Sequence, residues 1–110
     1  MKVVGFVLGF ADFLSPLTIQ EVASTLSREV FGGIPFVEKN VDEDYEVGTL
    51  CLKDAFIGLQ VELFGGDGGY TLELGTKPSA SVQDRDTVFD FSELIKQQVA
   101  KCGFDVVDGF

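Results

Sequence analysis

The chain has 110 residues, of which 45% are hydrophobic, and it carries 18 acidic against 8 basic side chains, a formal net charge of −10. This length predicts a single domain over residues 1–110, with enough apolar residues for a core that needs no metal or disulfide. The charge predicts that the protein repels nucleic acid and anionic membranes, so that a macromolecular partner should be basic.

The N-terminal segment 2–10 is rich in β-forming residues and bounded by turn residues, which predicts a central strand. One lysine followed by an apolar run is also how a signal peptide begins. Gly5, Gly9 and Asp12 break this run, however, and no cleavage site of small residues follows. No run reaches the ~18 apolar residues that a membrane span needs. We therefore expect a soluble, cytoplasmic protein.

A first helix is predicted to begin near residue 18 and to run to about Phe31. Two start signals compete: Ser15-Pro16 supplies an N-cap followed by proline, whereas Thr18 and Glu21 have the spacing of a capping box. Apolar residues recur at three and four positions along the segment, which gives it one apolar face. Gly32-Gly33 is expected to end it.

The middle of the chain is predicted to form antiparallel strands. Four segments read as strands, namely 34–39, 49–53, 57–63 and 70–74. The last two alternate apolar and polar residues, which is the pattern of a half-buried strand. Pro35 weakens the first of them, and an acidic loop is expected at 40–48.

The C-terminal part is predicted to form a long loop at 77–88, a second helix and a last strand at 104–107. Asp90 and Glu93 have capping-box spacing, with Phe89 and Leu94 placed as the accompanying apolar pair. The expected order is β-α-β-β-β-β-α-β. Two helices with one apolar face each predict an α+β two-layer sandwich, in which a largely antiparallel sheet carries both helices on one face.

The glycine-rich stretch 65–69 is the one segment that resembles a binding motif. A phosphate loop needs glycines between a strand and a helix, whereas these lie between two predicted strands, and no Lys-Ser or Lys-Thr follows them. The calcium repeat GGxGxD fails as well, because Tyr70 occupies the position of its aspartate. We expect a hairpin connection that holds no ligand.

The acidic stretch in the loop at 40–48 is the principal candidate for a binding surface. Its spacing imitates the start of an EF-hand, but Gly48 comes one place late and Lys53 stands where glutamate should be, so no metal site is expected. An aromatic residue among carboxylates is typical of an interface. The candidate partner-binding residues are Asp42, Glu43, Asp44, Tyr45 and Glu46, with Asp84 and Asp86 as a second patch. The alternative is a solvated acidic surface.

Catalysis has little support in the sequence. The chain has no histidine, which removes the commonest general base and metal ligand. Cys51 and Cys102 lie far apart in apolar-periodic segments, and we expect buried, reduced thiols. We predict no catalytic residues, no cofactor and no enzymatic activity.

Small, strongly acidic α+β domains without catalytic groups resemble bacterial immunity proteins, the inhibitors in toxin–immunity pairs. The resemblance lies in size, charge and architecture. It implies that the chain binds and neutralises a basic toxin domain, such as a nuclease, and favours a monomer over a homo-oligomer. Two alternatives remain, a structural or adaptor module that pairs with itself and a domain that binds a small ligand or a metal.

Overall fold

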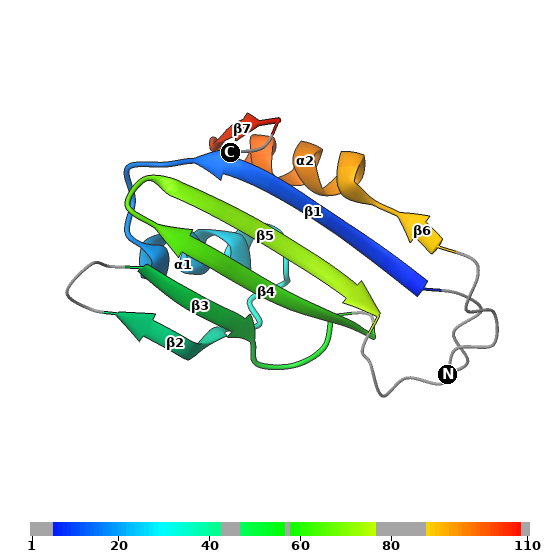
Figure 1. Ribbon diagram of the computed structural model, residues 1–110. Helices are drawn as coiled ribbons and strands as arrows, with labels where there is room; N and C mark the ends of the chain where they lie inside the picture. Colours follow the sequence, from blue (N-terminus) through cyan, green and yellow to red (C-terminus); the bar gives the residue numbers. More distant parts are fainter. Residues whose placement is uncertain (1–5, 43–46, 57, 77–87, 109–110) are drawn as a thin grey trace.

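The structure is a computed structural model that describes residues 6–42, 47–56, 58–76 and 88–108. Within these residues, seven strands form one sheet and two helices pack on it (Figure 1). The elements in chain order are β1 (Phe6–Leu14), α1 (Ile19–Glu29), β2 (Phe36–Asp42), β3 (Val47–Leu52), β4 (Leu59–Gly66), β5 (Gly69–Thr76), β6 (Val88–Asp90), α2 (Ser92–Lys101) and β7 (Asp105–Val107).

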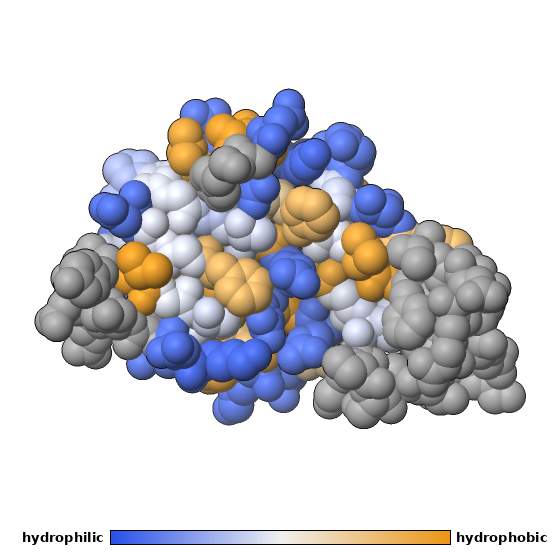
Figure 2. All heavy atoms as spheres, viewed as in Figure 1, coloured by the Kyte–Doolittle hydropathy of each residue, from blue (hydrophilic) through white to orange (hydrophobic). Residues whose placement is uncertain are grey.

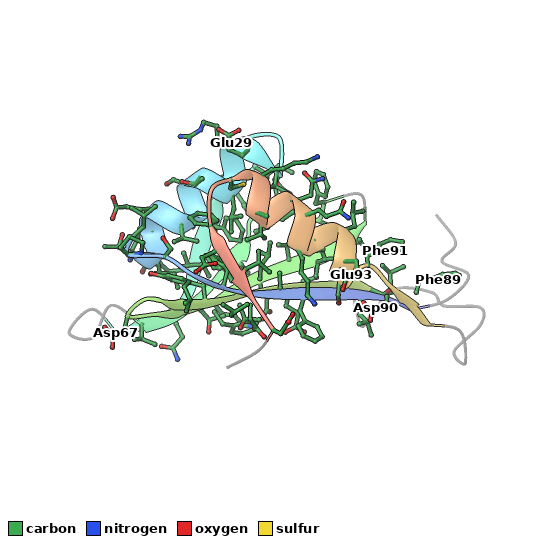
Figure 3. The ribbon with its side chains drawn as sticks, turned by 90° about the horizontal axis from the view of Figure 1, so that it is seen from above. Glu29, Asp67, Phe89, Asp90, Phe91 and Glu93 are labelled. Atoms are coloured by element: carbon green, nitrogen blue, oxygen red, sulfur yellow. The ribbon has the colours of Figure 1, made fainter. Side chains whose placement is uncertain are left out.

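The sheet is largely antiparallel, with the order β2-β3-β4-β5-β1-β6 and with β7 also paired to β1. Among the described strands, the one parallel pair is that of β1 with β6. Both helices cover the same face, as Figure 3 shows from the side of the sheet. The predicted α+β sandwich is therefore confirmed. The predicted order lacked β6, whose residues were assigned to the end of the loop at 77–88 and to the start of the second helix.

Helix α1 begins where the capping box predicted. The Thr18 side chain accepts from the Glu21 amide at 3.2 Å, and the Glu21 carboxylate accepts from the Thr18 amide at 3.1 Å. This reciprocal pair satisfies two amide groups that the first turn leaves without helical partners. Its buried residues are Ile19, Val22, Ala23 and Leu26. Ser15-Pro16 precedes the helix and does not cap it.

Helix α2 corrects the second capping-box prediction. Its N-cap is Phe91, one residue later than expected, and that residue's side chain makes no capping hydrogen bond. Asp90 instead accepts from the Ser92 amide at 2.9 Å, which bends the chain from β6 into the helix. Phe89 and Leu94, the apolar pair expected beside that cap, are 45% and 51% exposed.

The glycine-rich stretch is a β-hairpin, as predicted. Gly66 pairs with Gly69, so Asp67 and Gly68 form a two-residue turn. Both have positive φ, 53° and 90°, as the turn type that suits the twist of a hairpin requires. The stretch has no helix after it whose amides could hold an anion.

Strand β1 lies inside the sheet, and it runs to Leu14 rather than ending at residue 10. Its far edge pairs with β6 at one end and with β7 at the other. Between these short strands the Phe10 amide donates to the Ser92 hydroxyl at 3.1 Å, at the start of α2. Gly9 allows this close approach, because a Cβ there would lie 3.1 Å from the Phe91 carbonyl carbon.

The core fills the space between the sheet and the helices. Phe13 is fully buried and stacks on Tyr70 and Phe104, with ring centroids 5.6 and 5.0 Å apart. The Tyr70 hydroxyl donates to the Leu17 carbonyl, which ties the centre of the sheet to the segment that leads into α1. Phe31 closes the other side of the core with edge-to-face contacts.

Candidate protein-binding surface

The acidic residues proposed from the sequence fall mostly outside the described residues. This applies to Glu43, Asp44, Tyr45, Glu46, Asp84 and Asp86. The backbone of Asp42 is described, as the end of β2 opposite Val47. Thr76 and Val88, which flank the segment of the second patch, lie at the other end of the sheet. The described residues therefore do not bring the two predicted patches together.

Two acidic residues that the sequence analysis did not single out share the end of the sheet at which Asp42 lies. Asp67 is in the β4–β5 turn and Asp105 begins β7. Together with Leu14 they border an open hollow of about 610 Å³. Neither carboxylate forms an ion pair with a described residue. This end of the sheet is therefore acidic even without residues 43–46.

The face of the sheet opposite the helices, here called the open face, is covered by neither described helix (Figure 1 and Figure 3). Figure 2 shows it with apolar side chains, in tan and orange, among blue polar ones. Phe10 is 47% exposed on this face. Other large apolar side chains on it are Leu8, Leu14, Val37 and Val47. Apolar side chains among charges are typical of a surface that contacts another protein.

A row of charged and aromatic side chains crosses the open face. Register places Cys51 of β3, Glu62 of β4, Glu73 of β5 and Phe10 of β1 side by side. Lys39 reaches over Cys51 from the edge strand, and its ammonium lies 2.9 Å from the Glu62 carboxylate. This hydrogen bond and the charge of Glu62 raise the pKa of Lys39. Glu73 has no cationic partner among the described residues.

A small hollow lies beside the two glutamates. Its volume is about 210 Å³, and it is lined by Gln60, Glu62, Glu73, Gly75 and Thr76. The register sets Gly75 opposite both Gln60 and Leu8. A Cβ at Gly75 would lie 3.2 Å from the Val7 carbonyl oxygen, so a larger residue there would crowd the backbone of β1. The hollow thus adjoins two carboxylates that are directly opposite each other on neighbouring strands.

An apolar recess lies on the helix-covered side, between the end of α1 and the start of α2. Its volume is about 350 Å³, and Phe31, Phe56, Leu74, Phe91 and Leu94 are among its lining residues. Figure 3 shows Phe91, Asp90 and Glu93 around the start of α2. Glu93 is paired with Lys96 at 3.4 Å, so the charge at this rim is partly balanced.

Clustered metal ligands and carboxylates with a shifted pKa are two signs of a functional site. No group of three or more Cys, Asp or Glu side chains among the described residues could hold a metal ion. At Asp90, hydrogen bonds from Ser92 lower the pKa of the carboxyl group. That carboxylate serves the turn into α2, which is a structural role. Neither described helix is long and apolar enough to cross a membrane.

Both cysteines are free thiols, and each is half-buried rather than buried as expected. Cys51 belongs to the open face, whereas the Cys102 thiol donates to the Gln98 carbonyl with the two atoms 3.3 Å apart. Burial, followed by the nearby charge of Glu29, raises the pKa of Cys102. Deprotonation of this thiol is therefore disfavoured in the folded protein.

We expect Cys102 to react slowly with iodoacetamide in the folded protein, because the thiolate is the nucleophile. In a Cys51→Ser variant, alkylation near neutral pH should be slower than in the same variant unfolded in urea. The raised pKa also means that folding stability falls as the pH rises through the range of thiol ionisation. Mass spectrometry over time measures the rate. Equal rates in the folded and unfolded states would contradict the burial of this thiol.

No protein-family model, no curated protein and no solved structure matches the chain. What the chain does must therefore be inferred from its own surface chemistry.

Proposed function

We propose that the protein is an inhibitor of the immunity type, which binds a basic bacterial toxin domain and blocks its active surface with carboxylates. The observation that supports the proposal is that acidic side chains far outnumber basic ones, so that several carboxylates lack a cationic partner. The net charge is −10, and Asp67, Glu73 and Asp105 have no cationic partner among the described residues. Such a charge costs stability through self-repulsion, and a basic partner would relieve it.

A toxin that acts on nucleic acid needs a cationic surface, and an acidic inhibitor is attracted to that surface. Electrostatic steering raises the association rate, while contacts made after docking set the dissociation rate. The open face offers apolar side chains for such contacts next to its carboxylates. The acidic residues 42–46, with Asp84 and Asp86, are the proposed steering surface. A monomer in the cytoplasm of the producing cell is the form that this role requires.

The test begins with the reading frames that flank the gene. One of them, or its C-terminal domain, should stop growth when it is expressed alone, and co-expression of this chain should restore growth. The purified pair should form a one-to-one complex. If no flanking frame is toxic, or if this chain does not protect against the toxic one, the immunity proposal fails.

Neutralising the acidic loop should slow association. A variant with Asp42→Asn, Glu43→Gln, Asp44→Asn and Glu46→Gln should associate about tenfold more slowly at low salt, with dissociation changed less. Stopped-flow measurements at several salt concentrations would show this, since the Debye length falls from ~10 Å at 0.1 M to ~3 Å at 1 M.

A control variant removes the same number of negative charges, but at exposed positions outside residues 42–46. Its substitutions are Glu29→Gln, Glu38→Gln, Asp54→Asn and Asp108→Asn. It should associate faster than the loop variant does. If the two variants slow association equally, net charge alone steers the partner, and the loop is not the binding site.

A further inference from the structure

On the open face, one row of charged side chains has two negative charges side by side. The side chains run from Lys39 to Glu62 and then to Glu73, that is, positive, negative, negative. Like charges directly opposite each other on neighbouring strands are destabilising, because their Cβ atoms lie only about 5 Å apart. Lys39 compensates Glu62, but no described cation compensates Glu73. One further positive charge between the two glutamates would complete the row.

The surroundings of the glutamates favour a side chain that is both flat and cationic. Glu73 lies opposite Phe10 of β1, a residue that is 47% exposed on the same face. The hollow over Gly75 leaves room beside both carboxylates. A guanidinium group can donate to two carboxylates in its plane and can stack on an aromatic ring, whereas an ammonium group is a compact and strongly hydrated charge.

We propose that the open face docks a basic partner protein, one arginine of which enters between Glu62 and Glu73 and stacks on Phe10. The neighbouring Leu8 and Phe64 would contact apolar side chains around that arginine. This proposal rests on the proposed function and names the contact by which the partner is held. A second copy of this chain is a poor occupant of the face, because each copy carries a charge of −10.

The first test needs no partner. The probe is the n-butylguanidinium ion, which has the end of an arginine side chain, and the signals are the carboxyl carbons of the glutamates and aspartates in NMR spectra. We expect saturable shifts at Glu62 and Glu73 that a Glu62→Gln/Glu73→Gln variant abolishes. A matched Asp67→Asn/Asp105→Asn variant should bind the probe as the parent does. Chemical-shift changes of equal size at all exposed carboxylates would overturn the proposal.

Two further measurements make the test more specific. Lys39→Gln removes the competing ammonium group and should bind the probe more tightly than the parent. Glu73→Gln should raise Tm by about 2 °C or more, since it removes a repulsion between like charges. An unchanged or lower Tm would show that the two glutamates do not repel each other. Equal affinity for n-butylammonium would overturn the preference for arginine.

The final test uses the toxic domain found from the flanking reading frames. We expect the Glu62→Gln/Glu73→Gln variant to raise Kd by about tenfold or more, mainly through faster dissociation. If this variant binds and protects as the parent does while the acidic-loop variant fails, the docking proposal is wrong and the inhibitor function stands. If no toxic domain is found, the inhibitor function fails, and the probe experiment still decides whether the face binds a guanidinium group.

Discussion

Replacing Phe13 by alanine should destabilise the protein by about 3–5 kcal/mol, the usual cost of deleting a fully buried aromatic side chain. Phe13 has no exposed surface, and its ring stacks between Tyr70 and Phe104. The substitution would leave a cavity at the point where β1, β5 and the C-terminal segment meet. Domains of this size are stable by only about 5–15 kcal/mol, so much of the folded population should be lost.

Phe10→Ala is the matched control, since it makes the same chemical change on the same strand but on the open face. Phe10 is 47% exposed, and its removal should cost under about 1 kcal/mol. Urea unfolding followed by circular dichroism measures both variants, provided that the m-value is unchanged. An equal loss in the two variants would mean that the open face is covered in solution.

Replacing Gly65 by alanine should cost about 3 kcal/mol or more, although the change adds a single methyl group. Gly65 has φ of +120°, a conformation that residues with a side chain rarely adopt. Its Cβ would also lie 2.2 Å from the Gly69 carbonyl oxygen, so the hairpin would have to open. Because Gly65 pairs with Tyr70, the disturbance would reach the core.

Gly68→Ala separates backbone strain from this clash. Gly68 also has positive φ, 90°, but a Cβ there would meet nothing closer than the Ser15 carbonyl oxygen at 3.9 Å. Its substitution should therefore cost about 1 kcal/mol, from strain alone. The two variants can be compared by thermal unfolding. If they lose the same stability, the hairpin relaxes around the added methyl group and the contact with Gly69 is unimportant.

Local sequence signals predicted the elements that depend on local interactions. The capping box at Thr18 was correct because its hydrogen bonds join residues three positions apart. The hairpin at the glycine-rich stretch was predicted correctly because the segments on either side of it have the alternation of strands. The three-residue strand β6 was missed because nothing nearby in the sequence stabilises it. It is held by pairing with β1, some eighty positions earlier in the chain.

The pairing of Glu62 with Glu73 shows how far the candidate surface could have been predicted. The two residues are equally distant from the turn at Asp67-Gly68, so a two-residue turn at that place makes them neighbours. With four glycines in five positions, however, the sequence does not say which pair forms the turn. That the face is open follows from both helices lying on the other side, which their apolar faces did predict.

The pairing of β1 with β5, β6 and β7 has a consequence for how the chain is made. β1 leaves the ribosome early, but two of its three partners lie in the last quarter of the chain. The meander β2–β5 consists of neighbours in sequence and can pair while synthesis continues. One edge of β1 has to wait, with its amides and carbonyls unpaired, until residues 88–107 have emerged. An unpaired strand edge is a template for pairing with other chains, so the nascent protein is most prone to aggregate in the interval before residues 88–107 emerge.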